Sequence, residues 1–178
     1  MKIENQSNGK LPRGTMRQIE SVMETVPREH LRGIDYIRLV DRISDPRTKT
    51  SAQITELPGL YHPKQGGQQA WLEIALEAIL PRSKPLHKRL IPRLSFKGNL
   101  AAILISLIGQ HYYLTLRHSV KKGQMEPSIK AYTEKHLRRW HESQHTLRSR
   151  LFKPFQPTLE RWSRNLQKRA KQERQGRR

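Results

Sequence analysis

A run of nine residues limits what this chain can fold into more than any other feature. Residues 100–108 read LAAILISLI, a series of aliphatic side chains and alanines interrupted by a single serine. A helix over this run is apolar on every side, so it has no face to present to water. The helix must therefore lie at the centre of a fold and be covered all round, with Asn99 as its candidate N-cap.

The segments before this helix predict a helix and two strands. Residues 15–27 carry apolar side chains at helical spacing behind a Thr15 cap, and Pro27 ends the pattern. Residues 34–43 alternate apolar and polar side chains, which is typical of a half-buried strand. Residues 70–76 are interpreted as a second strand at the edge of the sheet. Two short strands in front of a set of helices favour a mostly helical α+β fold.

The remaining segments are expected to be irregular or helical. We expect a loop at 44–51 and an irregular surface excursion at the proline-rich 81–97. Residues 127–152 predict a helix that begins at Pro127, with Glu126 beside its positive end. A last basic helix is predicted over 158–178.

The charge of the chain is its strongest functional signal. Lys and Arg number 35 against 15 Asp and Glu, a net charge of +20. Residues 117–178 alone carry +13, and residues 81–97 contain six basic residues and no acidic one. Such fields attract polyanions, nucleic acid first and anionic membrane surfaces second. The absence of cysteine excludes disulfides, thiolate zinc ligands and a cysteine nucleophile.

Two short motifs resemble the minimal zincin fold of HExxH metalloproteases. SLIGQHYY (106–113) is similar to the LLHExGHH helix of that family, and EPSIKAY (126–132) to its downstream ExxAxxY-like helix. The resemblance implies a small sheet, a buried central helix and a second helix that begins with a glutamate. It divides the chain into a flexible arm (1–14), a zincin-like domain (15–136) and a basic helical extension (137–178).

The positions that carry the chemistry of this family differ here. HExxH reads Ser106-Leu107-Ile108-Gly109-Gln110, so serine and glutamine replace the two ligand histidines and leucine replaces the general base. Zinc hydrolysis needs those imidazoles, a third ligand and a carboxylate base. We therefore expect a retained fold with no catalytic residue, no metal and no cofactor. The vestigial cleft would comprise Ser106, Gln110, His111 and Glu126, with the last three hydrogen-bonded to one another.

The basic C-terminal half predicts a different activity. Its arginines and lysines would neutralise phosphates, and its aromatic residues, Trp140 and Trp162 among them, would either stack on bases or pack the helices. The expected nucleic-acid-binding residues are Arg138, Arg139, Arg148, Arg150, Lys153, Arg161, Arg164, Lys168, Arg169 and Lys171.

The leading hypothesis is thus a non-catalytic zincin-like protein that binds RNA, DNA or a ribonucleoprotein. One alternative is a metal-dependent hydrolase or peptidase with a rearranged site formed by His111, His118 and Glu126. Another is a scaffold for an acidic protein or an anionic membrane. The polar N-terminus and the short apolar run favour a cytoplasmic protein with no membrane span.

Overall fold

The computed structural model describes residues 1–43, 57–81, 86–116 and 122–152. The chain divides into two compact units, Met1–Trp140 and His141–Arg178. The sheet and the helices belong to the first unit, except for the part of the last helix that follows Trp140. The loop expected at 44–51 and the helix expected at 158–178 lie outside the described residues.

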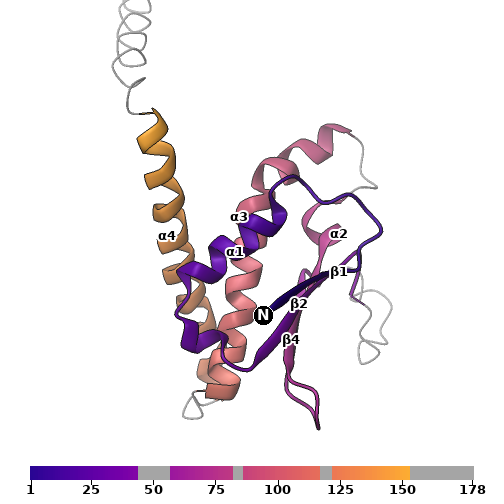
Figure 1. The fold of residues 1–178 in the computed structure, drawn as a ribbon, viewed down its shortest axis with the longest axis vertical. Coiled ribbons are helices and arrows are strands. Elements are labelled where there is room, and N and C mark those ends of the chain that lie inside the picture. Colours follow the sequence, from indigo (N-terminus) through magenta and orange to yellow (C-terminus); the bar gives the residue numbers. More distant parts are fainter. Residues whose placement is uncertain (44–56, 82–85, 117–121, 153–178) are drawn as a thin grey trace, which may run out of the picture. The chain divides into compact units, whose positions relative to one another are not determined.

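In the described part of Met1–Trp140, four strands form one mixed sheet (Figure 1). β2 is flanked by β1 and β4, which both run parallel to it, and β3 joins β4 antiparallel at the edge. Their bounds are β1 (Lys2–Asn5), β2 (Ile34–Val40), β3 (Gly59–His62) and β4 (Ala70–Ala75). With the helices around this sheet, the α+β class is confirmed.

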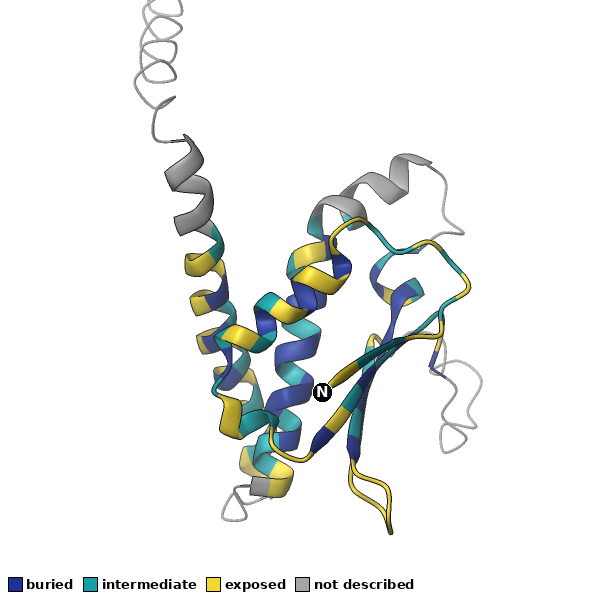
Figure 2. Cartoon of the chain, in the orientation of Figure 1, coloured by how far each residue is buried: buried dark blue, intermediate teal, exposed yellow. Residues whose placement is uncertain are grey.

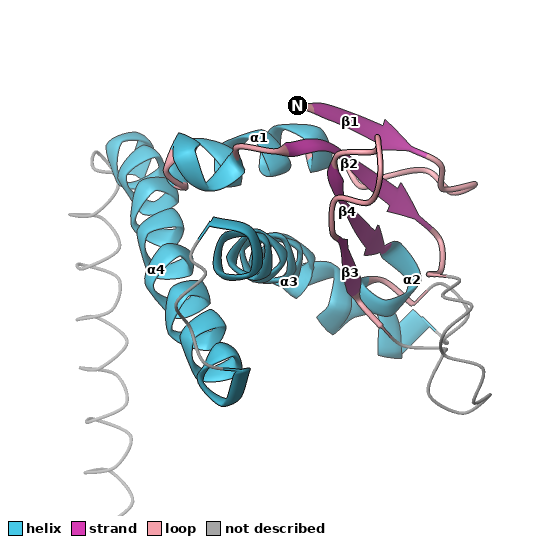
Figure 3. Cartoon of the chain, turned by 90° about the horizontal axis from the view of Figure 1, so that it is seen from below, coloured by secondary structure: helices cyan, strands magenta, loops and turns pink. Residues whose placement is uncertain are grey.

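The sheet has one buried face and one partly exposed face. Side chains that are fully buried alternate along β2 and β4 with side chains that are only partly buried. The buried set is Ile37, Leu39, Leu72 and Ile74, and the partly exposed set is Tyr36, Arg38, Trp71 and Glu73. Helices α1 (Thr15–Thr25) and α3 (Leu86–His111) lie on the same side of the sheet, as Figure 3 shows.

The apolar run of α3 forms the centre of the core (Figure 2). Residues 100–108 contain no exposed residue, and Leu100, Leu104, Ile105 and Ile108 are fully buried. The Met125–Trp140 part of α4 (Met125–Phe152) packs on the side of α3 that faces away from the sheet (Figure 3). The all-round cover that the sequence predicted thus comes from the sheet on one side and from α1 and α4 on the others.

Three sequence predictions are wrong in this region. The strand expected at 70–76 is not at the edge of the sheet, because β4 lies between β2 and β3. Residues 1–14 are not all a flexible arm, because Lys2–Asn5 pairs with β2 and Ile3 packs against the core. From Leu86 to Lys97 the chain is not an irregular excursion, because α3 begins at Leu86 and continues through Pro92. The helix bends between its first turns and its buried segment (Figure 1), as expected near an internal proline.

The expected caps are also corrected. Asn99 lies inside α3, where its side-chain Nδ2 donates to Ser95 Oγ at 3.3 Å. Gly14, with a φ of +81°, is the N-cap of α1, and the Thr15 hydroxyl donates to the Pro12 carbonyl instead. A residue other than glycine is strained in that left-handed conformation.

The edge strand β3 comes closest to α3 at Gly59. A Cβ added to this glycine would lie 2.8 Å from Ile103 Cγ2 and 2.9 Å from Leu107 Cδ1. Close packing of a strand on a helix therefore requires the glycine at this position. Leu107, at the position of the family's general base, is 3% exposed and belongs to this packing.

Candidate functional site

Three of the four residues of the expected vestigial cleft lie together between α3 and α4. Ser106 and Gln110 are one turn apart on α3, and Glu126 lies in the first turn of α4. They line a cleft of about 370 Å³, whose other lining residues are Ile129, Lys130, Thr133 and Glu134 of α4. The residues that the resemblance aligns with the two HExxH histidines and with the downstream glutamate thus share one site.

This cleft does not have the donor set of a zinc site. A serine hydroxyl and a glutamine amide stand where imidazoles would be needed, and both are poor zinc ligands. The Thr133 hydroxyl donates to the Ile129 carbonyl at 2.8 Å, so it is engaged with its own helix. Within the residues that the structure describes, no group of three or more His, Asp or Glu side chains is placed to hold a metal ion.

His111 lies outside the cleft, which corrects the predicted bonding of Gln110, His111 and Glu126. Its Nε2 is 2.8 Å from the Arg32 carbonyl oxygen, and its Nδ1 is 3.1 Å from the Tyr61 hydroxyl. Successive side chains on a helix point about 100° apart, so Gln110 and His111 cannot both face α4. No hydrogen bond joins Gln110, His111 and Glu126 in the described part of the chain.

The contacts of His111 define one tautomer. A carbonyl oxygen only accepts, so Nε2 carries the proton and donates to Arg32. Burial lowers the pKa of His111, an effect that the bond to Arg32 opposes in part. The neutral ring therefore accepts at Nδ1 from the Tyr61 hydroxyl, whose oxygen lies 3.0 Å from Thr115 Oγ1. Both ring nitrogens of His111 therefore have hydrogen-bond partners within the core. His118, the other histidine of the alternative metal site, lies outside the described residues.

A layer of histidine and tyrosine rings joins α4 to the rest of this unit. His30 Nδ1 lies 2.9 Å from the Tyr132 hydroxyl, and the ring of Tyr132 is 4.3 Å from that of His136. The ring of Tyr112 completes the layer, with its centroid 4.0 Å from that of His30. Burial lowers the pKa of His30 and raises that of Tyr132, so both side chains are uncharged at neutral pH.

His136 is the most unusual member of this layer. It is 3% exposed, and its Nδ1 has no hydrogen-bond partner among the described residues. Burial lowers its pKa to about 4, with smaller contributions from the positive charges of Arg139 and Lys135. The neutral imidazole therefore acts as a packing group that the fold cannot charge without cost.

The buried face of α4 decides between the two roles that the sequence allows for Trp140, stacking on bases and packing the helices. Tyr132, His136 and Trp140 follow one another at intervals of four residues and are all buried. Trp140 is 4% exposed, and its Nε1 donates to Ser21 Oγ of α1 at 3.1 Å. Trp140 thus packs α4 against α1 and is not available for stacking on a base.

The exposed residues of α4 between Ala131 and Trp140 are three cations and Glu134. Lys135, Arg138 and Arg139 are all exposed, and we refer to these three as the basic face of α4. Arg148 and Arg150 belong to the same helix in the second unit. The other expected phosphate-binding residues, Lys153, Arg161, Arg164, Lys168, Arg169 and Lys171, lie outside the described residues.

The sequence analysis missed one group of side chains, on the partly exposed face of the sheet. The rings of His62, Trp71 and Tyr36 form a column across β3, β4 and β2, with centroid separations of 3.6 Å and 5.2 Å. Arg38 lies against Trp71 and Tyr36, with its Cζ 4.7 Å and 4.9 Å from the two ring centroids. Their alternation with buried residues is visible in the sequence, but only the strand register shows that they meet.

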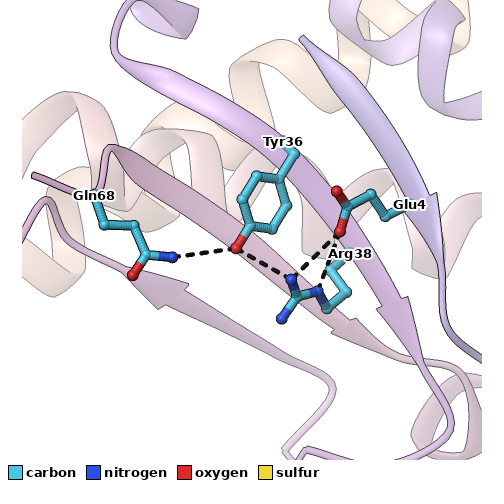
Figure 4. Close-up of polar contacts among 4 residues, drawn as sticks. All are labelled: Glu4, Tyr36, Arg38 and Gln68. Atoms are coloured by element: carbon cyan, nitrogen blue, oxygen red, sulfur yellow. Dashed lines mark hydrogen bonds and ion pairs between the residues drawn. The ribbon is translucent and has the colours of Figure 1, made fainter.

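Polar contacts fix this ring column from β1 and from the β3–β4 connection. Figure 4 shows Arg38 paired with Glu4 of β1, at 3.3 Å, and donating to the Tyr36 hydroxyl. Gln68 donates to the same hydroxyl at 3.4 Å. At the other end of the column, His62 Nε2 donates to Glu73 Oε2 at 2.9 Å. These contacts hold the two outer rings, Tyr36 and His62, and Trp71 is stacked between them.

Comparisons of the chain with protein-family models, with curated proteins and with solved structures find no match. Among the described residues, no helix combines the length and apolar character needed to cross a membrane.

Proposed function

We propose that this chain is a non-catalytic zincin-like protein that acts as a basic binding module for nucleic acid, RNA or DNA, or for a ribonucleoprotein. The observation that carries the proposal is the basic face of α4, where Lys135, Arg138 and Arg139 are exposed within two turns. The buried opposite face, with its ring layer, holds this helix in place. A rigid helix with closely spaced cations suits a phosphate backbone.

The electrostatics of α4 support this assignment. Burial is the main cause of the low pKa of His136, and the positive charges of Arg139 and Lys135 lower it further, which indicates that these two cations lie close to the ring. The whole chain carries +20, more than solubility requires of a small protein. Counterion release from the phosphates would then supply much of the affinity.

The zincin-like part of the proposal is supported by the cleft. Ser106, Gln110 and Glu126 share one site, as the family resemblance implies for its three ligand positions. Leu107 is buried in the core and has no group that takes a proton. The proposal therefore assigns this protein a binding function and keeps the cytoplasmic location expected from the sequence.

Metal analysis tests the hydrolase alternative. We expect purified protein to contain zinc far below stoichiometry, because Ser106 and Gln110 replace imidazoles and both nitrogens of His111 are engaged. A chelator should leave the melting temperature unchanged. Stoichiometric zinc that a chelator removes together with stability would favour a rearranged metal site.

Salt-dependent binding tests the proposed function itself. In the full chain, Lys135→Ala, Arg138→Ala and Arg139→Ala together should weaken binding to labelled DNA and RNA. The logarithmic salt slope should flatten by up to about three units, roughly one for each phosphate that is no longer neutralised. Fluorescence anisotropy from low to physiological salt measures both quantities.

A matched variant separates position from total charge. Arg13→Ala, Arg17→Ala and Arg28→Ala remove the same number of positive charges from positions outside α4. Equal losses of affinity in the two triple variants would show that α4 has no special role. Wild-type protein that binds no nucleic acid at low salt would contradict the function and favour an acidic protein partner.

A further inference from the structure

The ring column on the outer face of the sheet ends at a half-exposed imidazole. β3 is the edge strand of the described sheet, and His62 lies opposite Trp71 in the register of β3 and β4. Trp71 stacks on one face of the His62 ring, with an interplanar angle of 2°. The other face of the ring therefore turns away from β4, past the edge of the sheet, and no other ring of the described residues stacks on it.

We propose that this end of the column, the outer face of His62, stacks an unpaired nucleobase. The proposal rests on the proposed nucleic-acid-binding function and adds to it a preference for single-stranded over duplex substrates. A base inside a duplex has both faces covered by its neighbours, so only an unpaired or terminal base would extend the column.

The geometry of the column fits a planar aromatic ligand. The 3.6 Å separation and near-parallel planes of His62 and Trp71 correspond to the contact distance of stacked rings. A base on the outer face of His62 would repeat this spacing as one more member of the column. The bond from His62 Nε2 to Glu73 holds the imidazole in place, so stacking costs little side-chain entropy.

The charges around the column are compatible with a nucleic acid strand. Its two carboxylates are each engaged within the protein, Glu4 with Arg38 and Glu73 with His62. Two exposed lysines flank it, Lys2 opposite Tyr36 in the β1–β2 register and Lys64 two residues after His62. A strand with its base on His62 would therefore pass close to Lys64 and would meet no unpaired carboxylate within the column.

The exposed connection after His62 adds hydrogen-bonding groups. Residues 63–69 are all exposed, and Gln65, Gln68 and Gln69 among them carry side-chain amides. An amide both donates and accepts, so it suits the polar edge of a base. Of the three, Gln68 is already bonded to Tyr36, which leaves Gln65 and Gln69 as the better placed for base edges.

Binding of the full chain to three labelled probes tests the proposal. These are oligo(dT), an abasic strand of the same length and a duplex, measured by fluorescence anisotropy. Wild-type protein should bind oligo(dT) more tightly than the abasic strand. His62→Ala should weaken oligo(dT) binding by about 5-fold to 100-fold and leave the abasic strand and the duplex unchanged. His62→Phe, which keeps a flat ring, should retain the preference for oligo(dT).

Controls separate this proposal from the proposed function. Gln6→Ala changes an exposed glutamine outside the column and the 63–69 connection, so it should leave the large preference for oligo(dT) in place. In NMR spectra, oligo(dT) but not the abasic strand should shift the His62 ring-proton signals upfield, which a purely structural role would not produce. Thermal unfolding checks that each variant is folded.

Three results would overturn the proposal in distinguishable ways. If the protein binds all three probes and His62→Ala behaves like Gln6→Ala, stacking at His62 is wrong while the proposed function stands. If none of the probes binds at low salt, both fail. If a neutral oligosaccharide binds and His62→Ala abolishes that binding, while oligo(dT) and the abasic strand bind equally, the column recognises sugars instead of bases.

Discussion

Replacing Gly109 with leucine should destabilise this protein by about 3 kcal/mol or more, because the site has no room for a side chain. An added Cβ alone would lie 2.9 Å from Tyr132 Cδ1 and 3.4 Å from Cε1 of the same ring. The Tyr132 ring cannot move aside easily, since its hydroxyl lies 2.9 Å from His30 and the rings of Tyr112 and His136 pack around it. The α3–α4 contact should therefore separate or distort.

A second glycine of the same helix provides the matched control. Gly98 also lies inside α3, but a Cβ added there would meet nothing within 4 Å. Gly98→Ala should stabilise the protein by up to about 1 kcal/mol through helix propensity. Gly109→Ala gains the same helix propensity, but the close contact of its Cβ with Tyr132 should make the net change in stability unfavourable.

Urea unfolding of the four proteins, wild type, Gly109→Leu, Gly109→Ala and Gly98→Ala, gives these free energies directly. If Gly109→Leu unfolds at the wild-type urea concentration, α4 does not pack against α3 at this glycine. In that case the cleft between Gln110 and Glu126 would also be absent, since the same pair of helices forms it.

The Gly109 contact shows what the sequence could reveal about this fold. A glycine in an apolar helix is typical of close packing, and the four-residue spacing of Tyr132, His136 and Trp140 places these three side chains on one face. Both inferences depend only on the period of a helix, which is local. Ser106 and Gln110 line the same cleft for this reason, since residues four apart occupy one face.

The features that were missed depend on distant pairing. β1 contains one apolar residue that packs on the core, Ile3. The segment is a strand because its main chain pairs with β2, roughly thirty residues further along the sequence. The ring column likewise exists only in the register of three strands, which includes an irregularity between Ile34 and Ile37. Neither pairing leaves a periodic signal in the sequence.

The position of His111 was missed for a different reason. A resemblance to a metal-binding helix placed the histidine in a cleft, whereas the Arg32 carbonyl and the Tyr61 hydroxyl hold it on another side of α3. Gly33, next to Arg32, has a φ of +94°, a left-handed conformation that favours glycine, while a Cβ there would make only ordinary contact with His111 Cε1, at 3.6 Å. The partners of a buried histidine come from remote segments and are not encoded around it.

The second large effect is a loss of stability in acid, carried mainly by His136. Its pKa in the folded protein is about 4, against an ordinary value of 6.5. Below pH 6.5 the unfolded chain binds a proton that the folded chain excludes, so stability falls with pH until the folded ring also titrates near pH 4. The loss should reach up to about 3 kcal/mol over this window, with no further change above it from this residue.

The physical cause of this loss lies in the groups around the ring. Protonation would place a second N–H in a site where Nδ1 has no acceptor among the described residues, beside the positive charges of Arg139 and Lys135. His30 faces the same ring, and burial lowers its pKa as well, while Glu29 opposes that shift. His111 adds a further loss of the same sign, because burial lowers its pKa too.

His136→Phe isolates the contribution of this one residue. Phenylalanine keeps a flat ring beside Tyr132 and has no proton to bind, so the stability of the variant should fall less between pH 6.5 and pH 4 than that of the wild type. His141→Phe changes an exposed histidine of the same helix and should retain the wild-type pH dependence. Urea unfolding across this range measures the slopes. Equal slopes for His136→Phe and the wild type would mean that His136 is already accessible to protons in the folded state, and that this face of α4 is not packed against the ring layer.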